Sequence, residues 1–265
     1  MGVNSKIDWC DSTWNPVTGC LHGCDYCYAR RIAERFGGAE EYHHSSIGFN
    51  STVITKSDGS IHDLESPYFH ELRDMVAPYP FYFDPTFHRY KLDEPQHWKK
   101  PRNIFVCSMA DLFGNWVPDE WVEEVFKACA AAPQHRYLFL TKNPERYCKL
   151  DDANKLPHLD NFWYGSTVTR PGASAWCTIE PNTFLSIEPL LEPIHAGIAT
   201  FGCAKWVIVG AETGKRKGKV VPQKEWVDEI AAECMRCGKA IFMKDSLRNL
   251  MGDDFRQEFP WKAEL

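Results

Sequence analysis

Three cysteines, Cys20, Cys24 and Cys27, lie close together near the start of the chain with the spacing Cys-x3-Cys-x2-Cys. A cuboidal iron–sulfur cluster contains four irons, and each iron usually takes one cysteine thiolate. Three thiolates would therefore hold three irons and leave the fourth open. An open iron can bind a small molecule through an amine and a carboxylate, so this spacing indicates a cluster that also holds a ligand.

A zinc site is the main alternative for these cysteines. Structural zinc takes four ligands, commonly in paired Cys-x2-Cys units, and His22 or His43 could supply the fourth. A lone cysteine is usually a core residue, but three thiols bracketed by Gly19 and Gly23 form a different pattern. We therefore expect an iron–sulfur cluster here, with zinc kept as the alternative.

A second Cys-x2-Cys pair, Cys234 and Cys237, lies near the end of the chain. Cys234 falls on the apolar stripe of a predicted helix, and no partner pair follows it. Because a metal site would need further ligands, we expect Cys234 to be a core thiol.

Strands and helices alternate from about residue 100 onward. The short apolar runs are nearly continuous, which is typical of strands buried on both faces of a parallel sheet. A further strand is expected at Ile7–Trp9, just before the cysteines. The order strand–helix–strand predicts an α/β fold, a partial (β/α) barrel. The predicted strands are Asn103–Cys107, Tyr137–Thr141, Phe162–Val168, Phe184–Ile187, Trp206–Val209 and Ala240–Met243, and the predicted helices cover 29–36, 119–132, the segment after Asn143-Pro144, and 225–237.

One segment, residues 40–100, does not follow this alternation. It is rich in aromatic residues, histidine and proline, and we interpret it as an insertion packed on the main domain. The connection from Val168 to Phe184 is short for a helical crossover. Residues 1–265 are otherwise expected to form a single domain.

Polar residues follow nearly every predicted strand. In a βα barrel the working residues lie at the carboxyl ends of the strands, so these residues are candidates for a site. Glu188 and Glu212 are expected either to pair with Lys142 or Lys244, or to accept hydrogen bonds from a ligand. The basic run Lys215–Lys219 is either a solvated face or a contact for an anionic substrate. The candidates are Ser108, Asp111, Lys142, Ser166, Ser186, Glu188, Glu212 and Lys244.

Composition excludes several classes of protein. A hydrophobic content of 44% excludes extensive disorder, and a net charge of −6 argues against wholesale coating of a polyanion. The sequence contains no run of eighteen apolar residues, so no membrane span is predicted. The odd number of cysteines, 11, and the absence of an apolar segment at the N-terminus favour a reducing cytoplasm.

Besides the cysteine motif, eight segments spread along nearly the whole chain carry a family resemblance. They are Ile7–Trp9, Thr13–Cys20, Leu92–Pro95, Ile104–Phe113, Leu140–Arg146, Phe184–Leu190, Trp206–Gly214 and Phe242–Lys244. In these segments the chain resembles the phage-associated radical-S-adenosylmethionine-like family, a family of unknown function. Asn15-Pro16, Gly19–Cys24 and Tyr26–Arg30 carry a weaker resemblance, which is to the spore photoproduct lyase and DNA-repair-photolyase-like group.

These resemblances imply a radical S-adenosylmethionine enzyme on a barrel of that type, related to the TIM barrel. Cys20, Cys24 and Cys27 would hold a [4Fe-4S] cluster, and the open iron would bind S-adenosyl-L-methionine. An external flavodoxin- or ferredoxin-like protein would supply the electron. Tyr26 is expected to flank the adenine, Lys142 and Lys244 to meet the cofactor's carboxylate or the substrate, and the other strand-end candidates to contact the cofactor's polar groups.

The substrate is expected to be a nucleic-acid base or a nucleotide. A peptide or a small metabolite is the alternative for the same chemistry. A metal-stabilised binding protein without catalysis is the alternative from another class.

Overall fold

The computed structural model describes residues 5–38, 51–56, 59–70, 75–176, 178, 182–195, 201 and 203–262. The chain divides into two compact units. The first comprises Ser12–Tyr137, and the second combines Met1–Asp11 with Leu138–Leu265. We refer to them as the N-terminal and C-terminal units and describe each by itself.

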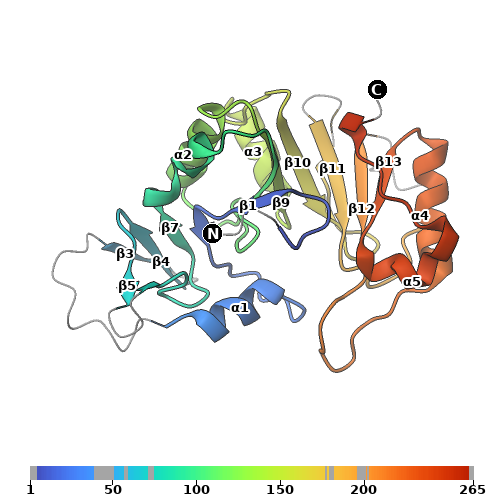
Figure 1. Ribbon diagram of the computed structural model, residues 1–265, viewed down its shortest axis with the longest axis horizontal. Helices are drawn as coiled ribbons and strands as arrows, with labels where there is room; N and C mark the ends of the chain where they lie inside the picture. Colours follow the sequence, from blue (N-terminus) through green and yellow to red (C-terminus); the bar gives the residue numbers. More distant parts are fainter. Residues whose placement is uncertain are drawn as a thin grey trace. The chain divides into compact units, whose positions relative to one another are not determined.

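A seven-stranded sheet in the order β1-β8-β9-β10-β11-β12-β13 organises the chain (Figure 1). The pairs β1–β8, β10–β11, β11–β12 and β12–β13 are parallel. The predicted α/β class with a parallel sheet is therefore confirmed. The strands are β1 (Ser12–Trp14), β8 (Asn103–Val106), β9 (Arg136–Thr141), β10 (Phe162–Thr167), β11 (Asn182–Ile187), β12 (Trp206–Val209) and β13 (Ala240–Met243).

The predicted first strand before the cysteines is confirmed, but its predicted position near Ile7–Trp9 is wrong, because β1 begins at Ser12. Residues around Ile7 form turns in which the Ser5 hydroxyl accepts a hydrogen bond from the Ile7 N–H at 2.9 Å. Trp9 is buried, and its ring packs edge-on against Trp206 with centroids 6.2 Å apart. The apolar character of this segment therefore reflects burial of an indole rather than strand pairing.

Three strands of the inserted segment, β3, β4 and β7, form a small sheet in the N-terminal unit together with β2, which precedes the insertion. The strand order is β2-β7-β4-β3. Residues 40–50 lie outside the described ranges, so the start of the predicted insertion is not covered. Arg89 donates to Asp63 and to Glu124 of helix α2, which ties this sheet to the helix. Besides β1 and β8, the strands and α-helices of this unit are β2 (Val17–Thr18), α1 (Tyr28–Phe36), β3 (Ser51–Lys56), β4 (Gly59–Leu64), the β5–β6 pair (Phe69–His70 and Met75–Val76), β7 (Thr86–His88) and α2 (Asp119–Ala130).

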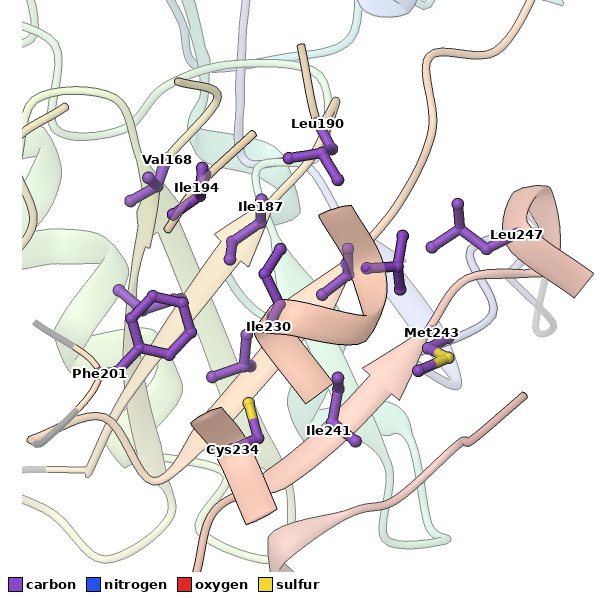
Figure 2. Packing of buried hydrophobic residues seen from close by; sticks show 14 of the residues in the cluster. Val168, Ile187, Leu190, Ile194, Phe201, Ile230, Cys234, Ile241, Met243 and Leu247 are labelled. Atoms are coloured by element: carbon purple, nitrogen blue, oxygen red, sulfur yellow. The ribbon is translucent and has the colours of Figure 1, made fainter. Parts of the chain in front are cut away.

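Helix α4 (Lys224–Arg236) covers one face of the strands of the C-terminal unit. Its buried side chains pack on alternate residues of β11, β12 and β13 (Figure 2). The alternate residues on the opposite face, Phe184, Trp206 and Phe242, form an aromatic cluster with Trp9, Phe259 and Trp261. Both faces are apolar because neither is exposed to water, which is why these strands have continuous apolar sequences.

The predicted helix after Asn143-Pro144 is confirmed, whereas α5 (Arg248–Met251) was not predicted. Helix α3 (Glu145–Asp152) begins after Pro144, and α5 follows β13. Gly238 has a left-handed φ of +64° just beyond α4, as expected for a glycine that ends a helix. The described part of the connection from β10 to β11, residues 168–176 and 178, contains no helix. Within the described ranges, no helix is both long enough and apolar enough to cross a membrane.

The packing of α4 makes a stability prediction. Ile230 is 1% exposed within the core, so Ile230→Ala should lower the free energy of unfolding by about 2–5 kcal/mol through lost burial and a residual cavity. Met235 lies on the same helix but is 62% exposed, and Met235→Ala should change this energy by no more than about 0.5 kcal/mol. Urea unfolding measures both variants. Equal losses would contradict the placement of α4.

Candidate functional site

The cysteine loop, residues 19–27, begins with a glycine that no other residue can replace without movement. Gly19 has a φ of +85°, and a Cβ on it would lie 2.2 Å from the carbonyl oxygen of Asp84. Its N–H donates to the Met109 carbonyl at 2.9 Å, and the Cys20 N–H donates to the Phe83 carbonyl at 3.1 Å. These contacts fix the backbone at Cys20, the first of the three cysteines.

Cys27 lies at the other end of the loop, where it caps helix α1. Its Sγ accepts a hydrogen bond from the Arg30 N–H at 3.3 Å, and its own N–H donates to the Cys24 carbonyl at 3.1 Å. A helix N-terminus favours negative charge, so this position suits a ligand thiolate. The Arg30 guanidinium also donates to the Cys20 carbonyl at 3.3 Å, which links the two ends of the loop.

The donor set of the loop fits an iron–sulfur cluster. Cys20, Cys24 and Cys27 are half-buried thiols, and Cys20 and Cys27 pack against the same small apolar cluster, which contains Ala29 and Met109. Thiolate sulfur is the ligand that iron–sulfur clusters take, and a backbone N–H directed at a sulfur tunes such a cluster. Across the described ranges, no three histidine, cysteine or acidic side chains are arranged to hold a single metal ion. The thiols share one loop, and binding would have to draw them together.

The segment after β8 holds this loop in place. His22 Nε2 lies 2.7 Å from Asp111 Oδ2, and the other oxygen of Asp111 accepts the Phe113 N–H at 3.0 Å. The His22 ring also packs edge-on against Trp116. Of the predicted site residues, Asp111 is therefore placed beside the cysteines, where it orients a histidine of the loop. The sequence did not identify His22 in this role.

Ser108 is the second predicted residue at this strand end. Its carbonyl accepts a hydrogen bond from the Tyr28 hydroxyl at 2.6 Å, and its hydroxyl donates to Asn15 Oδ1 at 3.2 Å. Asn15 also accepts the Met109 N–H at 2.9 Å. Ser108 and Asn15 thus connect the ends of β1 and β8 with the start of α1. Tyr26 is half-buried within the loop, and its predicted contact with adenine stays a prediction.

Two other cysteines are core thiols. Cys107 is buried at the end of β8 with a left-handed φ of +59°, and burial raises the pKa of its thiol to about 12. Cys234 is buried in the α4 core, where burial raises its thiol pKa to about 12 (Figure 2). The expectation that Cys234 is a core thiol is confirmed.

In the C-terminal unit, two hydroxyls lie side by side at the carboxyl ends of β10 and β11. Thr167 and Ser186 are register partners, so their side chains leave the sheet on the same face. Both residues are buried, and neither hydroxyl has a hydrogen-bond partner in the part of the chain that the structure describes. Buried polar groups normally have partners. A polar ligand or a water molecule that reaches this face would satisfy both hydroxyls.

Ser166 points to the opposite face of β10, because successive residues of a strand alternate. Its hydroxyl accepts the Trp176 N–H at 2.9 Å and so fixes the loop after β10. The structure does not bring Ser166 together with Ser186, and its predicted contact with the cofactor stays a prediction. Lys142 follows β9 and is exposed.

Glu188 and Lys244, at the ends of β11 and β13, form an ion pair. Both side chains are largely buried, with 25% and 16% of their surfaces exposed. They pass over Gly210 at the end of β12, where a Cβ would lie 2.8 Å from Lys244 Cδ. Of the two pairings expected for Glu188, the one with Lys244 is confirmed.

Glu212 has a different partner from the lysines that the sequence suggested. Arg216 donates two hydrogen bonds to it at 2.6 and 2.7 Å, and the Val220 N–H adds a third at 3.4 Å. These hydrogen bonds from Arg216 lower the pKa of the buried carboxyl. Glu212 thereby closes the basic loop, residues 213–220, and leaves Lys215, Lys217 and Lys219 exposed on it.

Residues 4–249 match the model of the family described as protein of unknown function (DUF5131). No curated protein and no solved structure matches the chain. Because the matched segment covers most of the chain, this protein belongs to the DUF5131 family.

Proposed function

We propose that this protein is a radical S-adenosylmethionine enzyme in which Cys20, Cys24 and Cys27 hold a [4Fe-4S] cluster. The observation that carries the proposal is the set of three thiol donors on the cysteine loop. Three half-buried thiols lie in one loop, whose first cysteine is fixed through Gly19 and whose last caps α1. We also propose that the fold is a partial barrel of the radical S-adenosylmethionine type. We further propose that the protein resides in a reducing cytoplasm, where thiols remain reduced.

When bound, the cluster and S-adenosyl-L-methionine would supply a 5′-deoxyadenosyl radical, made by one-electron cleavage of the sulfonium and able to abstract hydrogen from a substrate. The residues of the chain position these groups and exclude water. Asp111 holds the loop histidine, and Arg30 bridges the loop ends. Tyr26, Ser108, Asp111, Ser166, Ser186, Glu188 and Glu212 are the proposed contacts of the cofactor, with Lys142 and Lys244 for its carboxylate or the substrate.

Two observations in the C-terminal unit support a polar ligand there. The Ser186 hydroxyl is buried without a partner in the described residues, and an unpaired buried hydroxyl costs about 1–3 kcal/mol until a ligand satisfies it. Glu188 and Lys244 form an ion pair whose charges are partly desolvated. A ligand carrying both an amine and a carboxylate matches such a pair of opposite charges.

The proposed substrate is a nucleic-acid base or a nucleotide. The basic loop supports it, because Arg216 neutralises Glu212 and leaves three exposed lysines available for phosphate. A peptide or small metabolite is the alternative substrate. The alternative class is a zinc- or cluster-stabilised binding protein without catalysis.

The ligand assignment predicts the behaviour of Cys24→Ala. After anaerobic reconstitution, the parent should hold about four irons and four sulfides per chain and convert S-adenosyl-L-methionine to 5′-deoxyadenosine under dithionite. Cys24→Ala should lose the cluster colour and the cleavage together, because one of only three ligands is gone. Iron, sulfide and product analysis measure both.

The matched control is Cys148→Ala, which removes an exposed thiol from α3 outside the cysteine loop. It should retain the cluster and the cleavage. If the parent bound stoichiometric zinc and released no 5′-deoxyadenosine, the proposal of a radical S-adenosylmethionine enzyme would be contradicted. Full cleavage by Cys24→Ala would overturn the ligand set.

The substrate proposal predicts an effect of the triple variant Lys215→Ala/Lys217→Ala/Lys219→Ala. Binding of a single-stranded oligonucleotide should weaken, and the slope of log K against log salt should become shallower by up to about 2, because three phosphate contacts are lost. Fluorescence anisotropy over a salt series measures both quantities.

The control Lys99→Ala/Lys100→Ala/Lys127→Ala removes the same charge from exposed lysines of the N-terminal unit. It should bind the oligonucleotide like the parent. Equal weakening in both triple variants would show that net charge, and not the basic loop, governs binding.

A further inference from the structure

We propose that an exposed apolar stripe on helix α1 is the surface where an acidic one-electron carrier protein docks to reduce the cluster. The stripe consists of Tyr28, Ile32 and Phe36. The inference rests on the proposed function, which requires one electron from outside the chain. In this step the reduced carrier gives up one electron and the cluster takes it up, and no bond is made or broken.

The stripe follows from the helical spacing of its residues. Successive residues turn by about 100°, so residues four apart lie on one face of the helix. Tyr28, Ile32 and Phe36 have 43%, 37% and 50% of their surfaces exposed. A surface helix normally directs its large apolar residues into the core.

Helix α1 reverses the usual arrangement, because its buried residues are small and its exposed apolar residues are large. The face turned toward the protein carries the small residues Ala29 and Ala33, which pack with Phe83 and Met109. The large apolar residues are thus left outside while the helix is already fixed through its alanines. A contiguous exposed apolar surface of this kind marks an interaction site.

A further exposed aromatic side chain lies near the end of the helix. Tyr82 is 38% exposed and lies against Gly38, where a Cβ would approach its hydroxyl to 2.7 Å. Tyr82 therefore adds exposed aromatic surface close to the C-terminal end of α1.

Charge on the helix selects the partner. By the same 100° rotation, Arg31 and Arg35 border the stripe on the side away from the buried alanines, and both are exposed. Arg30 serves the cysteine loop and stacks over Phe83 instead. The chain as a whole carries a charge of −6, so this basic border is local. An apolar centre with a basic rim complements an acidic protein surface.

The stripe also lies next to the proposed ligands. Cys27 is the N-cap residue of α1, so Tyr28 follows a cluster ligand directly in the chain. The Tyr28 hydroxyl is bonded to the Ser108 carbonyl, which fixes the first residue of the stripe against the end of β8. A carrier seated on this face would therefore approach the cluster at Cys27. An antiparallel contact of α1 with a second copy of the chain is disfavoured, because a two-fold axis perpendicular to the helix would place the arginine borders against each other.

The experiment uses flavodoxin as the probe. Binding of the unreconstituted protein to immobilised flavodoxin is measured at low and high salt for the parent, for Ile32→Ser/Phe36→Ser and for Arg31→Glu/Arg35→Glu. Both variants should bind at least about tenfold more weakly, and the arginine variant should lose the salt dependence. The control Val221→Ser/Met235→Ser changes two exposed apolar residues of the C-terminal unit and should bind like the parent.

Formation of 5′-deoxyadenosine separates this inference from the proposed function. With dithionite, all reconstituted proteins should form product at the parent's rate, because a small reductant needs no docking surface. With reduced flavodoxin, only the two α1 variants should slow, by about tenfold. Unchanged flavodoxin binding and flavodoxin-driven rates in these variants would overturn the docking surface. The docking surface would also be contradicted if the two α1 variants kept flavodoxin binding but lost a dimer or lost binding to lipid vesicles. A parent inactive with dithionite would refute the proposed function itself.

Discussion

The close approach of Gly19 to the backbone of Asp84 is the constraint on which the cysteine loop depends. A side chain at this position would lie 2.2 Å from a carbonyl oxygen, and the φ of +85° is one that only glycine adopts without strain. The turn brings the Gly19 N–H to the Met109 carbonyl and Cys20 to Phe83. From there the loop is carried to Cys27, whose thiol begins α1. The backbone contacts at Gly19 and Cys20 therefore fix the position of the first thiol, and the hydrogen bond from the Arg30 N–H fixes the last one at the start of α1.

Residues of the N-terminal unit hold the cysteine loop in place, and the C-terminal unit carries buried polar groups of its own. In the N-terminal unit, the Asp111 carboxylate bonds to His22, and the Ser108 carbonyl accepts a hydrogen bond from the Tyr28 hydroxyl. The residues that follow β8 therefore support the cysteine loop. In the C-terminal unit, Thr167 and Ser186 keep buried hydroxyls without described partners beside strands that are otherwise apolar on both faces. Buried hydroxyls without partners lower the stability of the fold unless a ligand bonds to them. Through these two hydroxyls, strands that are otherwise apolar can still offer polar contacts to a ligand.

Much of the fold could be predicted because buried strands have continuous apolar sequences; Trp206–Val209 and Ala240–Met243 were located to the residue. Trp9 shows the limit, since an indole buried from a turn gives the same signal as a strand. For the candidate site, residue type and strand ends predicted Lys244 as one of two possible partners of Glu188, and the structure shows this pair. The contacts of Asp111 with His22 and of Glu212 with Arg216 were not predicted, because they depend on loop paths that spacing does not determine.

Electron paramagnetic resonance of the reduced, anaerobically reconstituted protein, recorded with and without S-adenosyl-L-methionine, tests the central claim most directly. A cluster held by only three cysteines keeps one iron open, and a ligand bound to that iron alters the spectrum. The account predicts a [4Fe-4S]⁺ signal that changes when S-adenosyl-L-methionine is added. A signal that the cofactor leaves unchanged, or a protein that takes up zinc and gives no cluster signal, would contradict it.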